Sequence, residues 1–224
     1  MRSQSYRGLI MRYQELIAES KLPPGSQIFV DLDGVCADFF TEYAKLAGIK
    51  SGNYRDIPPA KADPTLDKMI GTDFFNRLPM FPTAPALIRM VVAAAGGYKV
   101  LSSPLRKDHE NSEHWKKVWV ARHLHPAPEQ VIIAANKAKY ARNADGTPNV
   151  LIDDRGSNIS AWEAAGGIGI KYQADEDSLD RIALGLKRAE RIISGTETHD
   201  PQKLTSLDRG QMIQVHTSGD REEA

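Results

Sequence analysis

Short apolar segments that alternate with stretches of helical spacing are the feature that most constrains the fold of this 224-residue chain. Each apolar segment is only three or four residues long, which suits a strand. The expected strands are Ile28 to Val30, Tyr98 to Leu101, Val131 to Ala134, Val150 to Ile152 and Ile168 to Ile170. Because strands that alternate with helices form parallel sheets, the pattern predicts an α/β fold with a parallel sheet.

Helical patterns fill the intervals between the expected strands. The expected helices are Tyr6 to Glu19, Ala37 to Leu46, Ala86 to Ala95, Ser112 to Leu124, Asn158 to Ala165 and Asp177 to Ile193. Residues 41–81 include a stretch rich in Pro, Lys, Asp and Ala with little periodicity, and we expect them to form a small inserted helical cap. Around it we expect a leading helix and linker at 1–25, a core domain at 26–40 and 82–194, and a polar tail at 195–224.

Composition limits the function classes. The 29 basic and 29 acidic residues cancel, which argues against a broad, sequence-independent grip on nucleic acid but leaves room for a local basic pocket. Cys36 is the single cysteine, so no internal disulfide and no paired-cysteine zinc site are possible. No segment has the apolar length of a secretory or membrane-spanning segment, and we expect a cytoplasmic protein without membrane partners.

Polar side chains follow four of the expected strands, where each strand ends. They are Asp31 and Asp33, then Ser102 and Ser103, then Asn136 and Lys137, and finally Asp153 and Asp154. Because ligands bind at the carboxyl ends of parallel strands, these side chains are expected to meet in one site.

The first of these motifs has alternative interpretations by itself. The D-x-D-G string that begins at Asp31 also occurs in calcium-binding loops, but here Gly34 comes two places early and Val35 would replace an oxygen ligand. A purely structural pair of aspartates is a further alternative.

The ordered set of four motifs resembles the haloacid dehalogenase superfamily of phosphohydrolases. The resemblance implies a three-layer Rossmann-like core and a cap inserted after the first strand. It matches the superfamily's two aspartates to Asp31 and Asp33, its hydroxyl to Ser102, its lysine to Lys137 and its paired acids to Asp153-Asp154. Lys139 is a near competitor for the role of Lys137.

The physical reading of the residues agrees with that resemblance. Carboxylates gathered at one edge would repel one another unless a cation lay between them, and oxygen ligands suit Mg²⁺. We therefore expect Asp31, Asp33, Asp153 and Asp154 to hold magnesium. Asp31 is the expected nucleophile and Asp33 the expected acid and base, while Ser102 and Lys137 can donate to the phosphoryl oxygens.

Over roughly Ile28 to Arg155 the chain is similar to the 5'(3')-deoxyribonucleotidases. The shared strings are DLDGVCADFF, FFNRLPMFPTA, SSPL, the K-x-x-W-V that begins at Lys116, EQVII and LIDDR. The resemblance implies that Ser103 and Arg106 contact phosphate and that Phe39 and Phe75 line the substrate pocket, although core packing is the alternative for both phenylalanines. In the cap, Met69 lies about where the family has a tryptophan, so base preference stays open.

These observations predict a magnesium-dependent phosphatase that acts through an aspartyl-phosphate on (deoxy)ribonucleoside 5'-monophosphates. The expected partner is a small phosphomonoester, without extended nucleic-acid binding, and the family resemblance suggests a homodimer. The alternatives are a phosphatase of nucleic-acid ends, a phosphatase of a non-nucleotide phosphomonoester, and a non-catalytic binding protein on the same fold.

Overall fold

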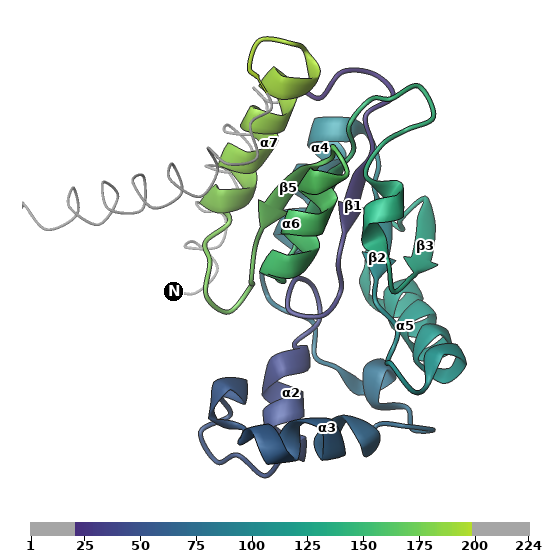
Figure 1. Cartoon of the computed structure of the whole chain (residues 1–224), viewed down its shortest axis with the longest axis vertical. Coiled ribbons are helices and arrows are strands. Elements are labelled where there is room, and N and C mark those ends of the chain that lie inside the picture. Colours follow the sequence, from purple (N-terminus) through teal and green to yellow (C-terminus); the bar gives the residue numbers. More distant parts are fainter. Residues whose placement is uncertain (1–20, 199–224) are drawn as a thin grey trace, which may run out of the picture.

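The structure is a computed structural model that describes residues 21–198, and its centre is a parallel sheet (Figure 1). The expected leading helix over Tyr6 to Glu19 and residues 199–224 of the expected tail lie outside the described residues. Within 21–198 the sheet has five strands in the order β3-β2-β1-β4-β5, and every neighbouring pair is parallel. The strands are β1 (Ile28–Val30), β2 (Lys99–Ser102), β3 (Gln130–Ile133), β4 (Val150–Asp153) and β5 (Ile168–Lys171).

Helices cover both faces of the sheet and give three layers. One face packs against α4 (Ala84–Ala95), α5 (His109–His123) and α7 (Asp180–Ile193), with which it forms the main hydrophobic cluster. The other face packs against α6 (Gly156–Ala164) and the short helix η3 (Lys137–Tyr140), around Phe29 and Trp162. This strand order with helices on both faces is a Rossmann-like doubly wound arrangement, which confirms the predicted α/β class.

The strand predictions are confirmed to within one residue at each end. Short apolar runs identify the strands well because β1 and β4, at the centre of the sheet, are buried on both faces. Helix ends were less accurate: α5 begins at His109 rather than Ser112, and α7 begins at Asp180 rather than Asp177. The end of α4 follows from Gly96, whose φ of 81° is the left-handed value that closes a helix.

Between β1 and α4 lies a mostly helical segment, which occupies the lower part of Figure 1. Its elements are α2 (Phe39–Leu46), η1 (Tyr54–Asp56), α3 (Pro59–Asp67) and η2 (Phe74–Arg77). The low-periodicity stretch, residues 48–64, contains the first part of α3, which buries only Thr65 and therefore shows no apolar stripe in the sequence. Met69, Phe74, Phe75 and Leu78 join the main hydrophobic cluster, so the last part of this segment packs with the core. The division at residues 41 and 81 stays a prediction.

Across residues 21–198, no helix has both the length and the apolar character that crossing a membrane requires.

Candidate active site

The turn after β1 places two aspartates at the carboxyl end of the sheet. The Asp31 N–H donates to the Ile152 carbonyl of β4 over 2.9 Å, which continues the sheet by one residue. The Leu32 carbonyl then accepts hydrogen bonds from the N–H groups of residues 35–37 and closes a tight loop. The backbone therefore fixes Asp31 and Asp33 before any ligand arrives.

Gly34 makes this loop possible in two ways. Its φ of 77° is in the left-handed region, which side-chain-bearing residues rarely adopt. A Cβ on Gly34 would also lie 2.6 Å from the Phe40 ring and 3.0 Å from the Asp154 carboxyl carbon. The glycine thus lets the β1 loop approach the paired acids that follow β4.

Lys137 joins the acids of β1 and β4. Its Nζ lies 2.8 Å from Asp31 Oδ2 and 2.6 Å from Asp153 Oδ2, and its side chain is 2% exposed. Asp153 also accepts hydrogen bonds from the Arg155 N–H and from Asn158 Nδ2. Lys137 therefore lies in the site, whereas its sequence competitor Lys139 is exposed elsewhere.

Lys116 of α5 is a second buried lysine, and sequence reasoning did not assign it to the site. Its Nζ donates to Asp33 Oδ2 over 2.6 Å, to Ser102 Oγ over 3.0 Å and to the Ser103 carbonyl over 2.8 Å. The signal was present, because Lys116 is three residues before the buried Trp119 and so falls on the apolar face of α5. A lysine on an apolar helix face needs a buried charge partner.

The two aspartates of β1 have opposite electrostatic environments. Burial pushes the pKa of Asp31 upward, but the ammonium groups of Lys137 and Lys116 outweigh it and hold that pKa below its usual value. The pKa of Asp33 is raised, because its burial and the charge of Asp31 outweigh the attraction of Lys116. Asp33 Oδ1 is also buried with no hydrogen-bond partner in the described part of the chain. The pKa values of these two neighbouring carboxyl groups are thus shifted in opposite directions.

Asp154 is the acid with the least support from the protein. Burial, followed by the negative charges of Asp31, Asp153 and Asp33, raises its pKa to about 8. Burial and Asp31 also raise the pKa of Asp153, to about 6, despite its contact with Lys137. Asp154 lines the cavity, and the positive charge of Lys137 only partly offsets these effects on its pKa.

This donor set fits a divalent cation. Asp31, Asp153 and Asp154 each offer a carboxylate oxygen, and these atoms lie within 4.8 Å of one another. Carboxylate oxygens suit magnesium, and a cation would offset the repulsion that raises the pKa of Asp154. The carboxylate of Asp33, which the sequence also assigned to the metal, lies outside this group and contacts Lys116 instead.

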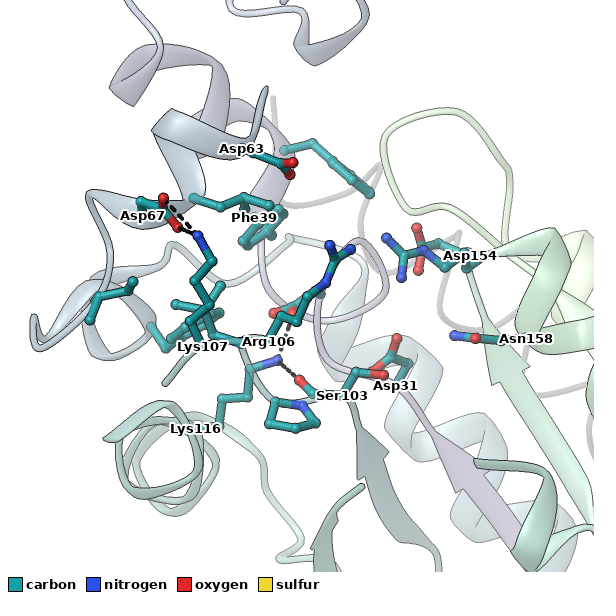
Figure 2. A pocket seen from close by; sticks show the side chains of 18 residues that line it. Asp31, Phe39, Asp63, Asp67, Ser103, Arg106, Lys107, Lys116, Asp154 and Asn158 are labelled. Carbon is teal, nitrogen blue, oxygen red and sulfur yellow. Dashed lines mark hydrogen bonds and ion pairs between the residues drawn. The ribbon is translucent and has the colours of Figure 1, made fainter. Parts of the chain in front are cut away.

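The acids open into a cavity of about 220 Å³ between the sheet edge and the α2–α3 segment (Figure 2). Asp33, Ser103 and Arg106 line it, and so do the rings of Phe39 and Phe75. Both phenylalanines also pack with the main hydrophobic cluster, so each of them lines the pocket and also packs in the core. Ser102 is buried behind the cavity wall, and its Oγ accepts the hydrogen bond from Lys116.

Further residues line the same cavity and were not assigned from the sequence. They are Phe40, Asp63, Leu66, Asp67, Ile70, Pro104, Leu105, Lys107, Arg155 and Asn158. In Figure 2, Asp63 and Asp67 of α3 face the side of the cavity away from Asp31. Asp63 is in the stretch of little periodicity and Asp67 follows it, and nothing in the sequence placed either near the acids.

Comparison with known proteins gives matches of fold only. No protein-family model matches the sequence, and no curated protein matches it. Among solved structures, a haloacid dehalogenase-like family hydrolase from Xanthomonas campestris is 11% identical with a TM-score of 0.48, covering 80% of this chain and 99% of its own. A haloacid dehalogenase family enzyme from Bacteroides thetaiotaomicron, solved as a magnesium complex, is 18% identical with a TM-score of 0.39, covering 68% and 95%.

A phosphonoacetaldehyde hydrolase-like protein from Oleispira antarctica is 12% identical with a TM-score of 0.42, covering 85% of this chain and 95% of its own. At these identities the likeness concerns the course of the chain and carries no substrate or residue role.

Proposed function

We propose that this chain is a magnesium-dependent phosphomonoester hydrolase that forms an aspartyl-phosphate on Asp31. The observation that best supports this proposal is the contrast between Asp31 and Asp33. They lie two residues apart and line one cavity, but their pKa values are shifted in opposite directions. Two carboxyl groups with opposed pKa shifts are suited to separate roles, one as a nucleophile and one as an acid.

In the first step, the ionised Asp31 carboxylate attacks the phosphorus of the substrate. The new oxygen–phosphorus bond forms as the bond to the leaving oxygen breaks, and Asp33 gives its proton to that oxygen. Lys116 holds Asp33 by a 2.6 Å contact and keeps it beside the nucleophile. Ser103 and Arg106 line the cavity and provide donors for the phosphoryl oxygens.

In the second step, water attacks the phosphorus of the aspartyl-phosphate. Asp33, now ionised, takes a proton from that water, and Asp31 leaves as a carboxylate with release of inorganic phosphate. Asp31, Asp153 and Asp154 would hold the magnesium, which supplies charge neutralisation at the transferring group. Lys137 keeps Asp31 and Asp153 together throughout both steps.

We propose a nucleoside 5'-monophosphate, ribo or deoxyribo, as the substrate. The shared strings with deoxyribonucleotidases support this choice, and so do the two aromatic side chains, Phe39 and Phe75, in the cavity that also holds the acids. Aromatic faces pack well against sugar and base rings. We further propose that the enzyme acts in the cytoplasm on small phosphomonoesters and does not bind extended nucleic acid. We also propose that it forms a homodimer.

A substrate panel tests the proposal. Purified protein with Mg²⁺ is incubated with ribo- and deoxyribonucleoside monophosphates, with sugar phosphates and with a 5'-phosphorylated oligonucleotide, and released inorganic phosphate is measured. We expect hydrolysis of the nucleoside monophosphates, its loss on addition of a chelator and its recovery on addition of excess Mg²⁺. A hydroxylamine-sensitive covalent phosphate on the protein is expected in acid-quenched samples.

Each alternative has its own outcome in this panel. Preference for the oligonucleotide would indicate a phosphatase of nucleic-acid ends, and preference for sugar phosphates would remove the nucleotide assignment. Turnover that persists in chelator would contradict the metal role of the acids. Binding of nucleotides without any phosphate release would identify a non-catalytic protein on this fold.

A further inference from the structure

A second cavity lies at the end of the sheet opposite the active site. Gln27 precedes β1, and Lys99 and Gln130 are the first residues of β2 and β3, whereas the catalytic side chains follow the strand ends. The cavity has a volume of about 300 Å³, and we name it the basal groove. Its lining residues are Gln27, Phe29, Lys99, Gln130, Ile132, Lys139, Tyr140, Arg142, Asn143, Ala144 and Asn149.

The basal groove is basic in a protein with no net charge. Lys99, Lys139 and Arg142 line it, and its lining contains no carboxylate. The neutral composition therefore conceals a local concentration of positive charge. Three cations around one cavity repel one another, and an anion is the ligand that relieves this repulsion.

The three cations have no acidic partner within the described residues. Lys99 Nζ donates to the Gln27 side chain over 2.8 Å and lies 5.8 Å from the centre of the Phe29 ring. Arg142 Nη1 donates to the Gly146 carbonyl over 2.6 Å, and Lys139 is exposed. Lys99 and Arg142 are thus held in place by neutral groups that leave their charge unbalanced.

We propose that the basal groove binds a diphosphate group, either as free pyrophosphate or as part of a nucleotide. Three cations match the multiple negative charges of a diphosphate better than those of a single carboxylate. Amide side chains of Gln27, Gln130 and Asn143 add hydrogen-bonding groups, and the half-buried Tyr140 ring offers a face for a base. The cavity volume is at the lower end of the range for small-ligand sites.

The basal groove and the active site share one short element. The helix η3 has four residues: Lys137 at its start contacts Asp31 and Asp153, while Lys139 and Tyr140 line the basal groove. A ligand that contacts Lys139 therefore binds the same turn of backbone that positions Lys137. This connection makes the groove a candidate regulatory site for the enzyme.

Calorimetric titration of the full chain with pyrophosphate in EDTA tests the proposal. Without a divalent cation the carboxylates of the active site repel the anion, so binding reports on the basal groove and does not depend on turnover. We expect saturable binding with a dissociation constant below about 1 mM. Lys99→Gln combined with Lys139→Gln is expected to weaken it by about tenfold or more.

The matched control is Arg89→Gln combined with Arg122→Gln, which removes the same charge from exposed positions on α4 and α5. It is expected to bind like the unaltered protein. Lys139→Glu alters one exposed residue, preserves the fold and is expected to weaken binding as well. Tighter binding of ADP than of pyrophosphate would identify a nucleotide as the source of the diphosphate. Absence of saturable binding, or an equal loss in the control, would overturn the proposal.

Discussion

Ion pairs at the carboxyl edge of the sheet are buried, whereas those that join the α2–α3 segment to the core are exposed. At the sheet edge, Lys116 and Lys137 are each 2% exposed and contact acids that are themselves largely buried. Between the α2–α3 segment and the core, Lys107 contacts Asp67 with both side chains about half exposed. Arg55 contacts Glu176 in a similarly exposed pair.

In the proposed enzyme, this difference separates the acids that would carry the reaction from the cavity wall that would contact the rest of the substrate. Breaking a buried ion pair costs much free energy, because the charge that remains is not solvated by water. The pairs of Lys116 and Lys137 therefore hold the acids at the sheet edge in one arrangement. Exposed pairs contribute about 1 kcal/mol or less, so these two ion pairs add little to the attachment of the α2–α3 segment, which depends on the buried side chains of its last part.

The largest expected effect is at the nucleophile. Asp31→Asn replaces a carboxylate with an amide of similar shape, which cannot form the aspartyl-phosphate, and we expect kcat to fall by about 1000-fold or more. The measurement is phosphate release under saturating substrate, with circular dichroism to show that the fold is retained. Glu110→Gln makes the same chemical change at an exposed position and is the control. Retention of a tenth of the activity in Asp31→Asn would remove Asp31 from its role.

Lys116→Met is expected to have the next largest effect. It keeps the length of the buried side chain but removes the charge that holds Asp33, so Asp33 loses its position and its pKa rises further. We expect kcat to fall by about 100-fold and the pH optimum to move upward. Lys117→Met, at the exposed neighbouring position, is the matched control. An unchanged pH profile would mean that Lys116 acts only in packing.

The sequence predicted the strand ends at the sheet edge better than the helices that contribute to the cavity. The strands and the site residues that follow them could be predicted because burial on two faces leaves continuous apolar runs, and parallel strands bring their ends together. Lys116 and Asp63 could not be predicted by that rule, because they come from helices, whose contribution to a site depends on tertiary packing. The helix α3 left no apolar stripe because it buries almost nothing.

The stability of the metal-free protein should depend on pH in an unusual direction. The pKa of Asp154 is raised to about 8 in the folded state, so between its unfolded value of 3.8 and 8 the folded state binds more protons than the unfolded state. Stability contributed by this group is present at low pH and is lost as pH rises towards 8. In EDTA we expect the free energy of unfolding to fall by on the order of 3 kcal/mol between pH 5.5 and 8.5.

Thermal melts across this pH range provide the measurement. Excess Mg²⁺ should remove most of the loss, because the cation stabilises the ionised acids. Asp154→Asn should also reduce the pH dependence in EDTA, because it removes the carboxyl whose pKa is raised to about 8. A metal-free protein that gains stability over this interval would contradict the repulsion described at the sheet edge.

The smallest expected effect is at the exposed pair between Lys107 and Asp67. A double-mutant cycle with Lys107→Ala and Asp67→Ala measures the coupling, which we expect to be about 1 kcal/mol or less, because water and salt screen both charges. Arg77 and Asp73 form an equally exposed pair at a spacing of four residues within one segment, and their cycle is the matched control. A coupling above about 2 kcal/mol for Lys107 and Asp67 alone would show that the two cavity walls are joined as firmly as the catalytic edge itself, and the contrast between them would then fail.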